Sequence, residues 1–149
     1  MRHSIKQKLL WTTLVVYLLL LLVCCVILYG HSTFQSSMSL DPSLEYQISI
    51  KDYRSGTNIS VTETDDQRAI LQSISTIRYK GITGSHPTDG QTSAYSLILS
   101  SADRQTVFII TEDTSAIVST PVRLRIDASD LYACARDLFS KYAHAENAR

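Results

Sequence analysis

The chain has 149 residues, and its 14 basic side chains balance its 14 acidic ones. This length allows one folded domain, at roughly 100–200 residues per domain. The first 30 residues carry Arg2, Lys6 and Lys8 and no acid, so the rest of the chain holds 11 basic against 14 acidic residues. That balance argues against a nucleic-acid-coating protein, which needs surplus positive charge. Three cysteines, two of them inside an apolar run, give neither a disulfide framework nor a four-cysteine zinc site.

Residues 9–28 read LLWTTLVVYLLLLLVCCVIL and contain no charged residue, glycine or proline. As a helix with a rise of about 1.5 Å per residue, this run spans the roughly 30 Å hydrocarbon core of a bilayer. The sequence therefore predicts a transmembrane helix over residues 9–29 that binds membrane lipid. A cleaved signal peptide is the alternative, because small residues follow at 30–32, although apolar runs of signal peptides are typically about 7–15 residues long.

Basic residues flank only the N-terminal side of this run, since the next one after Lys8 is Lys51. The positive-inside rule then predicts a cytoplasmic N-terminus and a C-terminal domain outside the cell membrane. Residues 1–8 form a cytoplasmic stub too short to bury a core. Residues 30–43 are rich in serine and end near an Asp-Pro pair, so we expect a linker there that lifts the folded part clear of the lipid. A domain over residues 44–143 and a frayed tail over 144–149 are expected to follow.

Alternation of apolar and polar residues predicts strands, and spacing by three and four residues predicts helices. We expect strands over residues 44–51, 57–63, 95–100, 105–111 and 116–126, and helices over 64–79 and from 127–129 to 142. Thr64 and Gln67 have the spacing of a capping box, which predicts a helix start at Thr64. Residues 80–92 hold three of the five glycines, so a loop is expected there. Pro121 belongs at an edge, at a bulge or at the start of a shorter strand.

This order, ββαβββα, predicts an α+β fold with a mostly antiparallel sheet and two helices on one face. Together with the basic stub, the single apolar helix and the serine-rich segment, it resembles small membrane-anchored extracytoplasmic domains of Gram-positive bacteria. The resemblance is architectural and covers residues 44–142. It implies an envelope location and a binding or regulatory role, and it assigns no functional residue.

If the helices cover one face only, some of the apolar residues Ile98, Phe108 and Ile110 are expected on the open face, where they mark a contact surface. Arg123 and Arg125 point to one side of the last strand and could bind an anion or an acidic partner. The loop that holds His86 is expected at the rim of this surface. The candidate partner-contact residues are Ile98, Phe108, Ile110, Arg123, Arg125 and His86. Burial of the apolar members under Tyr95 or under the loop is the competing interpretation.

No pattern of catalytic residues supports an enzyme. Ser85, His86 and Asp89 share one loop, but a Gly/Pro-containing turn rarely holds a catalytic triad in its geometry. The four histidines are scattered, so we expect no metal and no cofactor. The function predicted from the sequence is a single-pass membrane-anchored binding or regulatory module that acts by contact with a protein partner. The alternatives are an accessory subunit of a membrane complex and a cell-envelope hydrolase using His86 and Asp89.

Overall fold

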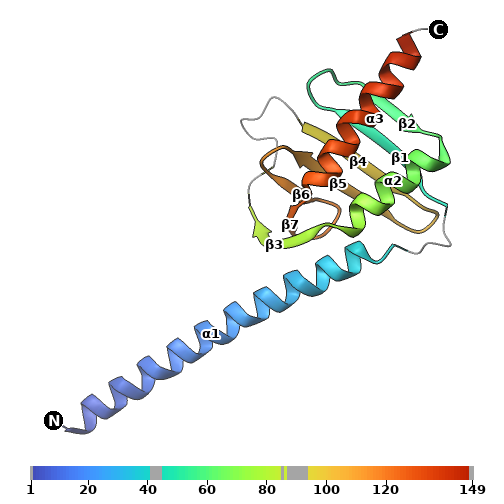
Figure 1. Cartoon of the computed structure of the whole chain (residues 1–149). Helices are drawn as coiled ribbons and strands as arrows, with labels where there is room; N and C mark the ends of the chain where they lie inside the picture. The colour runs from blue at the N-terminus through green and yellow to red at the C-terminus, as the bar shows by residue number, and fades with distance from the viewer. Residues whose placement is uncertain (1, 41–44, 85, 87–93, 148–149) are drawn as a thin grey trace.

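A computed structural model describes residues 2–40, 45–84, 86 and 94–147 of the chain. A long N-terminal helix leads into a domain in which two helices cover one face of an antiparallel sheet (Figure 1). The predicted α+β class, with both domain helices on one face, is confirmed. The elements are α1 (Arg2–Met38), β1 (Gln47–Asp52), β2 (Asn58–Val61), α2 (Thr64–Ser75), β3 (Arg78–Thr83), β4 (Ala94–Ser100), β5 (Gln105–Thr111), β6 (Ser115–Ile117), β7 (Arg123–Asp127) and α3 (Ser129–Asn147).

The sheet has the strand order β2-β1-β4-β5-β6-β7-β3, and every pair of neighbours is antiparallel. β1 and β2 form the predicted hairpin, and β4 and β5 form another. The chain therefore places β2 and β3, which lie on either side of α2 in the sequence, at opposite edges of the sheet. The β3 edge lies beside the end of α1, and the β2 edge lies far from it (Figure 1).

Two strands differ from the sequence prediction. The helix that was expected to reach residue 79 ends at Ser75, and residues 78–83 form β3 where the helix end and a loop were predicted. β3 pairs with β7 across a bulge between Tyr79 and Gly81, and Gly81 has a φ of 135°, a conformation that glycine adopts at little cost. The predicted strand over 116–126 is split into β6 and β7, with Pro121 in the connection between them.

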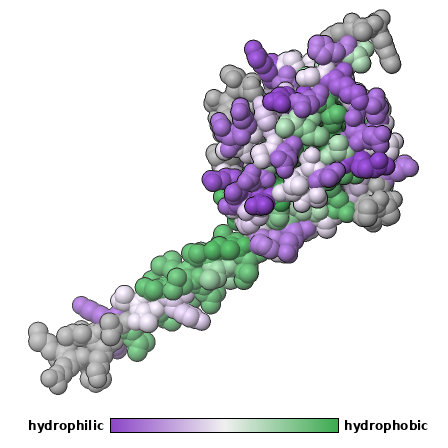
Figure 2. Space-filling view, in the orientation of Figure 1, coloured by the Kyte–Doolittle hydropathy of each residue, from purple (hydrophilic) through white to green (hydrophobic). Residues whose placement is uncertain are grey.

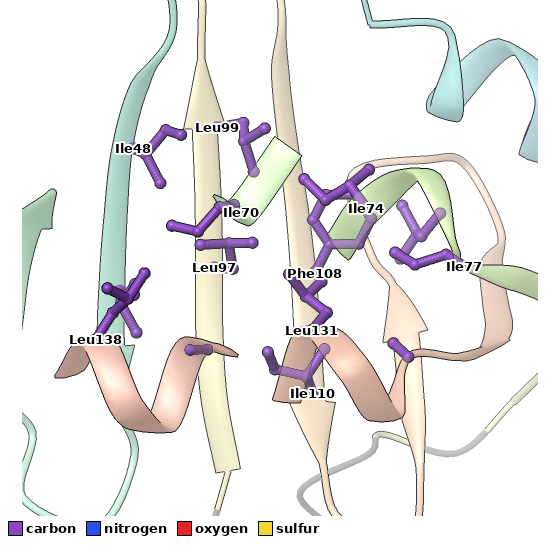
Figure 3. Close-up of a cluster of buried hydrophobic side chains, with 14 of the residues drawn as sticks. Ile48, Ile70, Ile74, Ile77, Leu97, Leu99, Phe108, Ile110, Leu131 and Leu138 are labelled. Carbon is purple, nitrogen blue, oxygen red and sulfur yellow. The ribbon is translucent and has the colours of Figure 1, made fainter. Parts of the chain in front are cut away.

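The core lies between the sheet and the helices α2 and α3 (Figure 3). α2 contributes Ile70 and Ile74, which are four residues apart and therefore share one face of the helix. α3 contributes Leu131, Ala135 and Leu138 at the same kind of spacing. The sheet supplies alternate residues of its strands, namely Ile48, Ile50, Ile59, Val61, Leu97, Leu99, Phe108, Ile110, Ile117, Leu124 and Ile126.

The expectation that Phe108 and Ile110 lie on an open face is wrong. Phe108 pairs with Leu97 and Ile110 with Tyr95, and this register directs all four side chains toward the helices. Phe108 and Ile110 are both 0 % exposed, so neither side chain can contact a protein partner while the domain is folded.

The second face of the sheet is also partly closed. Ile109 follows Phe108 and must point the other way, yet it is only 3 % exposed. Its neighbour Ala116 is fully buried, whereas Ile98 and Val107 are half-buried. Of the three apolar residues predicted to contact a partner, Ile98 alone lies on this face and is still reachable from solvent.

Candidate functional site

Residues 30–38 of the segment expected to be a linker are helical, whereas residues 41–43 lie outside the described residues. α1 continues through Met38 without a break, and its last turns pack against the domain. Gly30 is buried against β3, and the ring of Phe34 lies 5.5 Å from the ring of Tyr79 between centroids. His31 meets the same tyrosine edge-on, at 6.0 Å. We call this contact the junction: residues 30–38 of α1 with Tyr79 and Ile82 of β3 and Arg104.

The junction has no room for a side chain at position 30. A Cβ added to Gly30 would clash with Oη of Tyr79 and would lie 3.2 Å from Cδ1 of Ile82. Glycine lets the α1 backbone approach β3 at this point, because it lacks a Cβ.

The C-terminal end of α1 is held by Arg104, which directly precedes β5. Its guanidinium donates hydrogen bonds to the carbonyl oxygens of Ser36, at 2.5 Å, and of Ser39, at 3.5 Å. The last carbonyl groups of a helix lack partners within the helix, and a positive charge there is also favourable for the helix dipole. Arg104 therefore fixes the end of α1 to the turn between β4 and β5.

A sequence pattern for this docking exists but is weak. Gly30, Phe34, Ser37 and Met38 fall at i, i+4, i+7 and i+8, which places them on one face of a helix. Ser37 is 3 % exposed, and Phe34 and Met38 pack against the core. Two of the four residues are Gly and Ser, which are common in linkers. The packing role of this helix face is therefore visible only in the folded structure.

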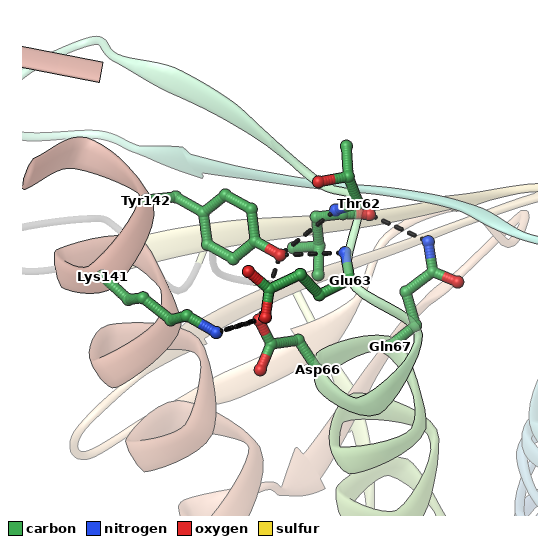
Figure 4. Close-up of polar contacts among 7 residues, drawn as sticks. Thr62, Glu63, Asp66, Gln67, Lys141 and Tyr142 are labelled. Carbon is green, nitrogen blue, oxygen red and sulfur yellow. Dashed lines mark hydrogen bonds and ion pairs between the residues drawn. The ribbon is translucent and has the colours of Figure 1, made fainter. Parts of the chain in front are cut away.

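A polar cluster ties α3 to the start of α2 (Figure 4). The hydroxyl oxygen of Tyr142 accepts hydrogen bonds from the backbone N–H groups of Thr62, at 3.3 Å, and Glu63, at 3.0 Å. The same hydroxyl donates to Oδ2 of Asp66 at 3.0 Å. Nζ of Lys141 lies 2.8 Å from Asp66 and 2.7 Å from Glu63.

This arrangement replaces the predicted capping box. The N-cap residue of α2 is Glu63, it makes no side-chain capping bond, and Nε2 of Gln67 donates to the carbonyl of Val61 instead of to Thr64. The Tyr142 hydroxyl satisfies backbone donors just ahead of the helix from a position about 80 residues later in the chain. Short-range sequence spacing contains no information about such a partner.

The acidic and basic groups of this cluster each stabilise the charged form of the other. The hydrogen bond from Lys141 lowers the pKa of Asp66 below its ordinary value of 3.8, and the Tyr142 hydroxyl acts in the same direction against the effect of burial. Asp66 and Glu63 in turn raise the pKa of Lys141. Every group has its partner within the chain, so the cluster is built to join α2 and α3.

Asp66→Asn should flatten the acid dependence of stability. Because folding lowers the pKa of Asp66, its contribution is complete above the unfolded value near 3.8 and is lost as the pH falls through the folded value. We expect the variant to lose about 1 kcal/mol at neutral pH. Below about pH 4 it should lose less further stability than the natural chain, as measured by thermal unfolding followed with circular dichroism.

Asp65→Asn is the matched control. Asp65 is the preceding residue, its side chain is 90 % exposed against 16 % for Asp66, and its partner Arg68 is also exposed. An exposed ion pair of this kind contributes little to stability. Equal pH profiles for the two variants would show that the cluster does not stabilise the domain through Asp66.

Among the remaining candidate residues, the two arginines share one face of β7, and His86 lies on another segment. Arg123 and Arg125 are both exposed on β7 and point away from the helices, since Leu124 between them is buried. His86 is half-buried just beyond β3. Ser85 and Asp89, the other members of the loop considered for catalysis, lie outside the described residues.

An open hollow of about 380 Å³ lies where β7 meets the start of α3. Lys80, Arg125 and Asp127 are among the residues that line it. Nζ of Lys80 lies 3.2 Å from Oδ2 of Asp127, so these two charges neutralise each other. Within the part of the chain that the structure describes, Arg123 and Arg125 are in no ion pair, and no group of three or more metal-binding side chains occurs.

Three comparisons, with protein-family models, with curated proteins and with solved structures, gave no match to this chain.

Proposed function

We propose that the chain is a single-pass membrane-anchored binding or regulatory module, with its N-terminus in the cytoplasm and its domain outside. The apolar part of α1 is long enough to cross a bilayer, and none of it is buried in the domain. Figure 2 shows this apolar surface along α1, in contrast to the mostly hydrophilic face of the domain. The large side chains of residues 10–29 are exposed, and no described residue of the domain covers them. Lipid would cover them in a membrane.

The observation that carries the proposal is the continuity of α1 from the apolar segment into the junction. A domain on a flexible linker could search for partners at some distance from the bilayer. With α1 in a bilayer, the contacts of the junction would instead keep the domain close to the membrane surface. We therefore infer that its partner is itself in, or bound to, the same membrane.

The same continuity favours a second candidate, an accessory subunit of a membrane complex. Because the end of α1 packs against the domain, a single partner can contact both the helix and the domain. A partner that binds only the domain fits the first proposal better. Removing the domain's contacts with the partner while keeping α1 would distinguish the two candidates. An accessory subunit would still bind its partner in part through α1, whereas a module that binds only through its domain would not bind.

Orientation is tested by cysteine labelling in intact cells. With Cys24, Cys25 and Cys134 replaced by serine or alanine, Ala102→Cys places a thiol on the exposed turn after β4, and Ser4→Cys places one before the apolar run. We expect a membrane-impermeant maleimide to label position 102 completely and position 4 only after permeabilisation. The reverse pattern would overturn the orientation, and a shortened chain starting near Ser32 would show cleavage in place of anchoring.

A further inference from the structure

The path of α1 across the domain shows which edge faces the membrane. Gly30, the first residue after the apolar run and Tyr29, contacts β3 at the edge of the sheet. Further along α1, Ser36 and Ser39 are bonded to Arg104, between β4 and β5. α1 therefore runs from the edge strand inward, and the domain extends away from the bilayer in the order β3 to β2. Figure 1 shows the same arrangement, with β3 beside α1 and with β2 and the end of α3 remote from it.

The exposed edge of β3 carries an apolar residue at this level. Ile82 is 40 % exposed and contacts position 30 of α1. Its exposed surface is thus continuous with the apolar surface of the predicted span, which ends at Tyr29, itself 51 % exposed. Tyrosine is favoured in the headgroup zone, so Ile82 is placed beside that zone.

Basic residues lie on the strand next to Ile82. Ile82 pairs with the buried Leu124, so its side chain points to the helix side of the sheet, and the arginines on either side of Leu124 point to the opposite side of the same edge. β3 and β7 together contain four basic residues and one acidic residue, whereas the chain beyond residue 30 has an acidic excess. Arg123 pairs with Thr83, and Arg125 pairs with Gly81, the two neighbours of Ile82. Adjacent strands are about 4.8 Å apart, so both arginines lie one strand away from the residue that contacts α1.

We propose that the β3 edge binds the headgroup layer of the bilayer, with Arg123 and Arg125 on the phosphates of anionic phospholipids and Ile82 in the interfacial zone. Arginine binds phosphate through two parallel hydrogen bonds, and its aliphatic part tolerates an interface. The bilayer would also cover an edge strand that is otherwise free to pair with another chain. This inference depends on the proposed membrane anchoring, and it leaves the half-buried Ile98 and the β2 side for a protein partner.

The test uses the full-length chain, one copy per nanodisc, with phosphatidylcholine or an equal mixture of phosphatidylcholine and phosphatidylglycerol. Ile82→Trp in a Trp11→Phe background gives a single tryptophan at the β3 edge, since the chain has one tryptophan. We expect blue-shifted emission and strong quenching by lipids brominated near the headgroup end of the acyl chains. Tyr53→Trp in the same background is the matched control, because Tyr53 is similarly exposed, at 43 %, but lies on the turn between β1 and β2. It should not be quenched.

The charge contribution is tested by adding Arg123→Glu to the Ile82→Trp chain. Reversing one charge at an anionic surface should lower the ratio of docked to undocked domain roughly thirtyfold. Quenching should fall in the mixed lipid and change little in pure phosphatidylcholine. Arg54→Glu, an equal charge reversal on the remote β1–β2 turn, should leave the quenching unchanged.

Trp11 of the unsubstituted chain separates the two proposals, because it reports on the span alone. If Trp11 is quenched and tryptophan at position 82 is not, the anchoring stands and the lipid contact of β3 is wrong. If Trp11 is not quenched either, both proposals fail. A blue shift at position 82 without quenching, seen only with two copies per disc, would assign the edge to a second copy of the chain and overturn the lipid contact.

Discussion

Alanine at position 108 should lower the stability of the domain by about 3–5 kcal/mol, the usual result of removing a phenyl ring from a packed core. Phe108 is among the largest side chains that are fully buried, and it lies at the centre of the sheet between Leu97 and Ile117. A domain of this size is stable by only about 5–15 kcal/mol. We therefore expect the thermal midpoint of the domain to fall by more than 10 °C, measured by near-ultraviolet circular dichroism of the full chain in detergent.

Val107→Ala is the control, because Val107 is the neighbouring residue on the same strand but points to the other face and is only half-buried. It should cost about 1 kcal/mol. If Phe108→Ala is no more damaging than Val107→Ala, Phe108 is not the core residue described above, and the original expectation of an exposed residue would have to be restored.

The fold class was predictable because the hydrophobic periodicity of most elements is strong. The alternation in β1 and β7 and the stripes of α2 and α3 are visible in the sequence, and they correspond to residues that are buried in the structure. β3 was not predictable in this way. Its burial alternates only weakly, it contains a glycine at a bulge, and it is held in place by β7, more than 40 residues later in the chain.

Phe108 shows why the contact surface could not be chosen from the sequence. Residues 107–110 are all apolar, so periodicity cannot tell which of them point toward the helices. The register with β4 decides this, and register depends on pairing that the sequence does not specify locally. The orientation of the arginines of β7 was easier to predict. They alternate with apolar residues that must be buried, so the arginines have to lie on the opposite, exposed face of the strand.

The largest difference from the sequence prediction is the junction, where α1 packs against the domain. Serine and glycine are common in linkers, but in a helix they also allow close packing against another element. In residues 30–38, glycine and serine allow α1 to pack closely against the domain. Their packing joins α1 to the domain where the sequence predicted only a linker.

Leucine in place of Gly30 should separate the end of α1 from β3 while the domain remains folded. The added side chain would overlap Tyr79 and Ile82, and overpacking of this kind costs about 1–3 kcal/mol. That cost corresponds to roughly a 5- to 150-fold decrease in the ratio of docked to undocked helix. Hydrogen exchange of the backbone amides of residues 31–38 should become faster by a similar factor.

The matched variant is Ser32→Leu, which adds the same side chain to an exposed position of the same helical turn. It should leave exchange in residues 31–38 unchanged, because leucine favours the helix and nothing lies against that face. The amides of β4 and β5 should keep their protection in both variants, since the core under α2 and α3 does not include Gly30. Faster exchange throughout the domain of Gly30→Leu would mean that α1 is part of the folding unit, whereas unchanged exchange at residues 31–38 would mean that the helix does not depend on its contact with β3.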